Sequence, residues 1–271
     1  QGSGKFSVLD IRRLADAEKS LYSLYNRAIP LRKRAYLSNL SLSPLVIVDT
    51  NVLIDELRNR MNEHLDLYSE YRLDISGQGR FHRILLRRAE EGVIYLWLPR
   101  VVQNELREFC RDLSRVRALF EGNLVKKERL DEEITDELIQ DLCNSIIGDF
   151  TTWRPMDLHL EDEVESAEII ESLDNFLRDH LEIYEELTAM KRLRGEPIRT
   201  EIDGNDVYPE RNDIKIMRLA SVIAERPIED IGCLLLATRD GDFTLVARAI
   251  EEKLGFGIIK NSRTLQIWLG R

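Results

Sequence analysis

Short runs of apolar residues alternate along the chain with segments whose apolar positions repeat every three or four residues. The runs at 45–48 (LVIV), 93–98 (VIYLWL) and 232–237 (GCLLLA) are each followed by such a segment, and a fourth run at 256–260 (FGIIK) follows a glycine. Strands of a parallel sheet that is covered on both faces have continuous apolar runs, and successive strands are joined by helices. The pattern therefore predicts an α/β fold, a central parallel sheet flanked by helices.

Two regions fall outside this alternation. Residues 5–29 have helical spacing that ends at Pro30, so we predict an N-terminal helical extension over 1–44, in which residues 1–4 are typical of an expression-tag remnant. Residues 121–206 are strongly acidic and contain stretches of helical spacing. We predict a helical hairpin inserted into an α/β domain that spans 45–271. Acidic helices of this kind are typically solvated and packed on the body; a surface for a homo-oligomer or a protein partner is the alternative.

The charge and the cysteine content limit how the protein could contact a nucleic acid and where in the cell it is expected. The net charge of −10 gives no overall attraction to phosphates, so contact with a nucleic acid must use local basic patches. A carboxylate-rich metal site would itself lower the net charge. The three cysteines stand far apart without a Cys-x-x-Cys pair, which favours reduced residues and a cytoplasmic protein. No apolar run reaches the roughly 18 residues of a membrane span, so we expect no membrane partner.

Acidic residues follow the predicted strands or lie at the start of the predicted helices. Asp49 follows the first run, Asp240 and Asp242 follow the third, Glu105 lies in the first turn after the second, and Asp213 opens the helix at 212–220. Each alone has a simpler explanation as a helix cap or a turn residue. Because the carboxyl ends of parallel strands meet at one edge of the sheet, we expect all of them to face one pocket.

Such a pocket requires a cation. Two carboxylates about 4 Å apart repel each other by roughly 4 kcal/mol at an effective dielectric constant of about 20. Ligation by oxygen alone selects a hard ion, and the histidines lack a metal-ligand spacing, so the expected ion is Mg²⁺ or Mn²⁺. Attack of a metal-bound water on a phosphodiester is the reaction that this arrangement suits.

Four segments in this order, IVDTNVLIDEL, LPRVVQNELREF, NDIKIMRLA and LLLATRDGDFTLVA, resemble the PIN-domain nuclease superfamily. The resemblance covers most of residues 45–270 outside the insertion. It implies a Rossmann-like fold and a metal-dependent ribonuclease that cleaves single-stranded RNA to leave 5′-phosphate and 3′-hydroxyl ends. Carried over by motif, it also implies the following site: metal ligands Asp49, Glu105, Asp213 and Asp240, an auxiliary ligand Asp242, and the positioning residues Asn51 and Thr238.

The chain departs from compact members of that superfamily in its insertion and its N-terminal helix. The insertion leaves the third acid open between Asp206, in a loop-like segment, and Asp213, whose helical context favours it. A second function also stays open, a PIN-fold protein-binding or regulatory module whose nuclease activity is weak or controlled by a partner.

Two basic clusters are candidates for contact with a nucleic acid. The first is favoured because its helix lies between the first two strands. It comprises Arg80, Arg83, Arg87 and Arg88. The second follows the predicted hairpin and comprises Lys191, Arg192, Arg194 and Arg199.

Overall fold

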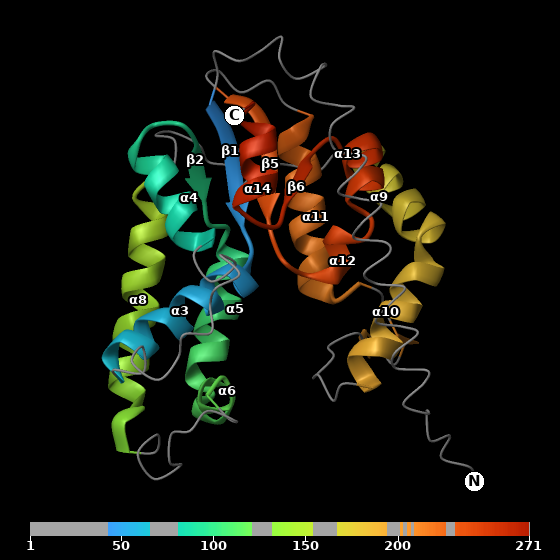
Figure 1. Ribbon diagram of the computed structural model, residues 1–271. Coiled ribbons are helices and arrows are strands. Elements are labelled where there is room, and N and C mark those ends of the chain that lie inside the picture. Colours follow the sequence, from blue (N-terminus) through green and yellow to red (C-terminus); the bar gives the residue numbers. More distant parts are fainter. Residues whose placement is uncertain are drawn as a thin grey trace, which may run out of the picture.

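The computed structural model describes residues 43–65, 81–120, 132–153, 167–193, 201–202, 205–206, 209–225 and 231–270 (Figure 1). Residues 1–42 of the helical extension that we expect at the N-terminus lie outside these residues, and its last two residues begin the first strand.

Within this part of the chain, four parallel strands form the central sheet in the order β2-β1-β5-β6. They are β1 (Ser43–Val48), β2 (Tyr95–Trp97), β5 (Ile231–Ala237) and β6 (Gly257–Ile259). Residues 45–48 of β1 are fully buried, as expected for a strand with both faces covered. The predicted α/β class with a parallel sheet is confirmed, and the architecture is compatible with a Rossmann-like fold.

Helices flank the sheet on both sides. On the β2 side, α8 packs against α3, α5 and β2, and α4 packs against α3 and β2 (Figure 1). On the β6 side, α11 packs on β5, and α14 on β6. The first group comprises α3 (Thr50–His64), α4 (Phe81–Glu90), α5 (Arg100–Arg111), α6 (Leu113–Ala118) and α8 (Asp136–Thr151). The second comprises α11 (Arg211–Ala224), α12 (Gly241–Thr244), α13 (Ala247–Leu254) and α14 (Ser262–Trp268).

The predicted insertion divides between two places. Its first described helix, α8, belongs to the body of the domain, because it buries Ile139, Cys143, Ile146 and Phe150. The hairpin itself is formed by α9 (Ala167–Asp179) and α10 (Leu181–Leu193). Helix α9 packs on α11 and α13, and α10 packs on α12. A short antiparallel pair, β3 (Glu201–Ile202) and β4 (Asn205–Asp206), follows.

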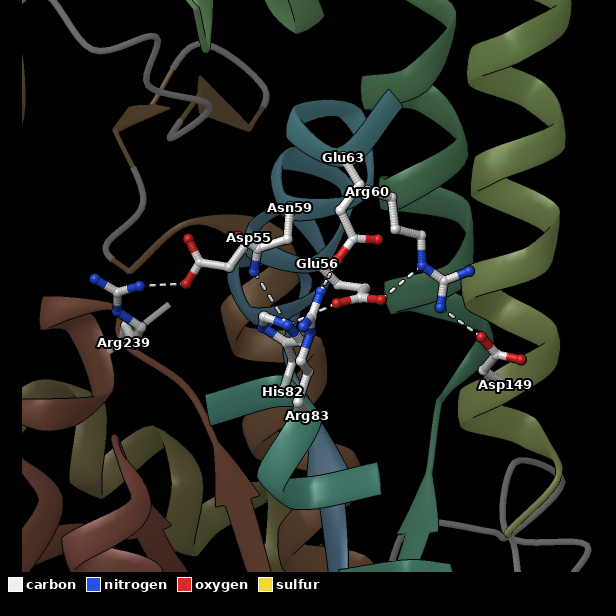
Figure 2. Close-up of polar contacts among 9 residues, drawn as sticks. All are labelled: Asp55, Glu56, Asn59, Arg60, Glu63, His82, Arg83, Asp149 and Arg239. Atoms are coloured by element: carbon white, nitrogen blue, oxygen red, sulfur yellow. Dashed lines mark hydrogen bonds and ion pairs between the residues drawn. The ribbon is translucent and has the colours of Figure 1, made fainter. Parts of the chain in front are cut away.

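A buried polar network fastens α3 to α4 and α8 (Figure 2). Glu56 lies at its centre, with Oε2 2.6 Å from Nε2 of His82 and Oε1 2.6 Å from Nε of Arg60. Arg60 continues to Asp149 and to Ser145 on α8. Burial raises the pKa of Glu56, but its contacts with His82 and Arg60 outweigh burial and hold that pKa below its ordinary value. Because charged groups buried without partners are costly, this network fixes the position of α3.

Gly257 tests how tightly β6 is packed. A Cβ at this position would lie 2.5 Å from Trp268 Cζ2 and 2.8 Å from Leu235 Cδ2. We expect Gly257→Ala to lower the free energy of unfolding by about 1–3 kcal/mol, the usual effect of overpacking. Gly148 in α8 is the matched control, because a Cβ there would meet nothing within 4 Å. Gly148→Ala should raise stability by roughly 0.5–1 kcal/mol. Urea denaturation measures both, and equal stability of Gly257→Ala and the native protein would contradict this packing.

Candidate metal centre

Three strands end at the same edge of the sheet, and their ends are joined by backbone hydrogen bonds. The amide of Asp49, which follows β1, donates to the carbonyl of Ala237 at the end of β5 (3.0 Å). The amide of Thr238, which follows β5, donates to the carbonyl of Ile259 at the end of β6 (3.0 Å). The loops after these strands therefore lie side by side, as the position of binding sites in parallel sheets predicts.

Asp49 is almost fully enclosed, with 4% of its surface exposed. Its Oδ1 accepts from the amide of Thr50 (2.7 Å), so it caps α3. Its Oδ2 accepts from Asn51 Nδ2 and from Thr238 Oγ1, both at 2.6 Å. Burial raises the pKa of Asp49 from 3.8 to about 7, and the charges of Asp240 and Glu105 add to the rise. Asp49 therefore caps a helix and is also repelled by the charges of neighbouring acids.

Asn51 and Thr238 connect the two loops. Oδ1 of Asn51 accepts from the amide of Arg239 (3.1 Å), while its Nδ2 also lies 3.1 Å from Thr238 Oγ1. Thr238 Oγ1 in turn accepts from the amide of Asp240 (3.0 Å). The two side chains thus fix the Asp49 carboxylate relative to the loop that carries Asp240, which is the positioning that the PIN-domain resemblance implies for them.

Three carboxylates form a tight cluster at this edge. Each of Asp213, Asp240 and Asp242 offers one oxygen atom, and these atoms lie within 4.8 Å of one another. Asp213 comes from the first turn of α11, Asp240 caps α12, and Asp242 lies in the first turn of α12. Burial raises the pKa of both Asp213 and Asp242 above the ordinary range, and the charge of Asp240 raises each further. We call these residues the aspartate cluster.

Of the two candidates for the third acid, Asp213 is a member of the aspartate cluster. Asp206 ends the short strand β4, and its side chain lies outside what the structure describes. Asp213 faces Asp240 from the start of a helix, which is the context that favours it in the sequence.

Glu105 lies beside Asp49 and outside the aspartate cluster. The sequence predicted Glu105 in the first turn of the helix. Helix α5 begins at Arg100, so Glu105 lies in its second turn. Its Oε2 accepts from Thr50 Oγ1 (2.6 Å). Among the five acids proposed from the sequence, the structure thus distinguishes two subsets. Asp213, Asp240 and Asp242 are directly grouped, and Asp49 and Glu105 are joined to each other through Thr50.

Sequence reasoning missed the main cationic partner of these acids. Lys191 was a candidate for contact with a nucleic acid in the less favoured basic cluster, but it is 8% exposed and lies against the aspartate cluster. Its Nζ is 2.8 Å from Asp242 Oδ2, 3.4 Å from Asp240 Oδ1 and 3.6 Å from Glu210 Oε1. Burial lowers the pKa of Lys191, but the charges of Asp240 and Asp242 reverse that effect and raise it above its ordinary value.

The buried face of α10 contains a second polar group near the cluster. Tyr184 is fully buried, and its hydroxyl has no hydrogen-bond partner within the described part of the chain. Burial raises its pKa well above the ordinary value, with further contributions from the charges of Asp242 and Asp213. An unpaired buried hydroxyl that feels the charges of Asp242 and Asp213 fits a site that holds an oxygen-coordinated cation with its water, because the hydroxyl would then gain a partner.

The basic cluster favoured from the sequence lies away from the acids. Arg83 pairs with Glu63, while Arg87 and Arg88 pair with Glu91. The end of α4 lies at the opposite edge of the sheet, because the carbonyl of Gly92 accepts from Ser43 at the start of β1. Arg80, Arg194 and Arg199 lie outside the described residues, and Arg192 is exposed. The described members of the first cluster therefore do not border the aspartate cluster.

Two other basic residues stand at the acidic edge. Arg239 lies between Thr238 and Asp240 and pairs with Asp55 on α3 (Figure 2). Lys260 directly follows Ile259, the residue that accepts from the Thr238 amide, and is half-buried.

Comparison of the chain with known protein families, with curated proteins and with solved structures yields no match. No helix in the described ranges is long and apolar enough to cross a membrane.

The raised pKa of Asp49 predicts a pH-dependent effect of Asp49→Asn in the presence of a chelator. A carboxyl whose pKa is raised on folding stabilises the fold fully below pH 3.8 and loses that contribution as pH rises through about 7. The stability of Asp49→Asn relative to the native protein should therefore increase between pH 4 and pH 7.5, by up to about 4 kcal/mol.

At the acidic end Asp49 is protonated but still has an accepting oxygen at both positions, whereas an amide has an NH2 group at one of them. The variant should therefore be the less stable protein there. Urea unfolding across this range measures the difference. Parallel pH curves for the two proteins would show that Asp49 ionises as freely in the folded as in the unfolded chain.

Proposed function

We propose that this protein is a divalent-metal-dependent ribonuclease that hydrolyses phosphodiester bonds of single-stranded RNA. The observation that carries the proposal is the aspartate cluster, three carboxylate oxygens within 4.8 Å of one another at the carboxyl edge of a parallel sheet. Oxygen ligands of this kind select Mg²⁺ or Mn²⁺. When bound, such a cation polarises the scissile phosphate and lowers the pKa of a coordinated water.

The chain's own residues have separate roles in this proposal. Asp213, Asp240 and Asp242 hold the cation. Asp49 is held beside this cluster by its hydrogen bonds with Thr50, Asn51 and Thr238, and it would complete the ligand set. Glu105 is oriented in the same way by Thr50.

The substrate class rests on the resemblance of four segments to PIN-domain nucleases. The site adds a supporting feature, because Arg239 and Lys260 bring positive charge to an edge that is otherwise acidic. Phosphate groups are attracted by such residues independently of base sequence. The Arg239 guanidinium already pairs with a carboxylate, Asp55, and a phosphate can replace that partner.

Two observations favour a second candidate function, a PIN-fold protein-binding or regulatory module with weak or partner-controlled cleavage. Lys191 already supplies positive charge to the aspartate cluster. The exposed large apolar residues of the described chain all lie on α9 and α10, and they are Ile170, Leu181, Ile183 and Leu193. A partner that bound this hairpin would act close to the site.

Asp240→Asn separates the two functions. Asn can still cap α12, so the fold should persist, but the cluster loses one ligand charge. We expect metal-dependent cleavage of end-labelled single-stranded RNA to fall by at least about 100-fold, the usual effect of removing a preorganised group that stabilises charge. Asp179→Asn, at a surface ion pair with Lys253, is the matched control and should cleave normally.

Cleavage is measured with Mg²⁺ or Mn²⁺ and with a chelator as the metal-free reference. Activity of Asp240→Asn equal to that of the native protein would exclude the aspartate cluster as the catalytic site. If the native protein shows no metal-dependent cleavage, the module without catalysis becomes the better assignment.

A further inference from the structure

We propose that Lys191 is an internal cation that occupies the divalent-metal site of the metal-free protein, and that α10 must release it before the metal binds. The inserted helix would then regulate the site, since release of its Lys191 side chain and loading of the metal are the same event. This inference rests on the metal site of the proposed function.

The position of the ammonium group carries the proposal. Nζ of Lys191 contacts Asp242 and Asp240, which are two of the three acids that form the aspartate cluster. The charge of the third, Asp213, also acts on Lys191 and raises its pKa. A divalent ion bonds to oxygen at about 2.1 Å, which brings it against an ammonium held by the same carboxylates. The two cations repel each other and compete for one set of ligands.

Helix α10 is seated on the loop that carries these ligands. Its buried face presents Tyr184, Leu187, Thr188 and Lys191, spaced as one side of a helix. Leu187 contacts the loop closely, because a Cβ at Gly241 would lie 3.4 Å from Leu187 Cδ2. The contacts of Lys191 therefore join α10 to the residues that would bind the metal.

The other helix of the hairpin is held separately. Lys253 on α13 pairs with Asp179 at the end of α9, and the carbonyl of Lys253 accepts from Ser172 (3.4 Å). Release of Lys191 thus requires α10 or its side chain to move, while the contacts of α9 with the body can remain. This arrangement also provides a control lysine, because Lys253 is in a hairpin ion pair but does not contact the aspartate cluster.

Lys191→Met keeps most of the length of the side chain and removes its charge. We expect this variant to bind Mn²⁺ at least about tenfold more tightly than the native protein, equal to about 1.4 kcal/mol of binding free energy. In a chelator its melting temperature should fall, because the three carboxylates lose their counter-charge. Lys253→Met should change neither the Mn²⁺ affinity nor the difference between metal-free and metal-loaded melting temperatures.

Calorimetric titration with Mn²⁺ and thermal unfolding measure these effects. If the native protein binds Mn²⁺ and Lys191→Met binds it equally or more weakly, the inference is overturned but the proposed function is not. Lys191 would then be a residue that orients the carboxylates. Absence of Mn²⁺ binding in both proteins would overturn the inference and the proposed function together.

A measurement on the native protein covers the case in which Lys191→Met does not fold. The Lys191 side chain is 10% exposed and that of Lys253 is 45% exposed. Saturating Mn²⁺ should therefore accelerate acetylation of Lys191 by an amine-reactive ester, detected by mass spectrometry, and leave Lys253 unchanged. Equal protection of Lys191 with and without bound Mn²⁺ would overturn the inference.

Discussion

The mutual repulsion of carboxylates at one edge of the sheet is the constraint on which the rest of this structure depends. Burial raises the pKa of Asp49, Asp213 and Asp242, and neighbouring acids raise each of them further. Crowded and buried carboxylates lower the stability of the folded state unless a cation in the site neutralises their charge. Lys191 is the cation that the described chain supplies, and a divalent ion is the one that its oxygen ligands would select.

The surrounding structure keeps these acids from separating. Hydrogen bonds between strand ends place Asp49 beside Ala237 and Thr238 beside Ile259. Asn51 and Thr238 then connect the two loops through their side chains. The network of Glu56, His82 and Arg60 fastens α3 to its neighbours, and α3 begins at the cap residue Asp49 (Figure 2). Since every acid stands next to a fixed strand or helix end, relaxation by movement would disturb the core.

Much of this arrangement could be predicted from the sequence, and the failures have physical reasons. The apolar runs at 45–48 and 232–237 identify buried parallel strands, and the topology of such sheets brings the acids that follow them together. The packing of α8 could not be assigned, because an amphipathic pattern shows that one face is buried and not which element buries it. The placement of Arg87 and Arg88 at the edge opposite the acids could have been predicted from the sequence. A helix that connects two parallel strands runs back to the other edge of the sheet.

Lys191 was the most instructive miss. Lysine is rarely buried, so a basic run after a helix is ordinarily assigned to the surface. A signal was nevertheless present, because Lys191 continues the helical spacing of Tyr184 and Leu187 onto the same face. Its partners, Asp240 and Asp242, are distant in sequence, and only the docking of α10 on α12 identifies them.

Anomalous diffraction from crystals grown with Mn²⁺ tests the metal centre most directly. The predicted result is an anomalous peak among the carboxylate oxygens of Asp213, Asp240 and Asp242, with the Lys191 ammonium no longer 2.8 Å from Asp242. Crystals saturated with Mn²⁺ that show no peak in the aspartate cluster, and Lys191 still in contact with Asp242, would contradict it.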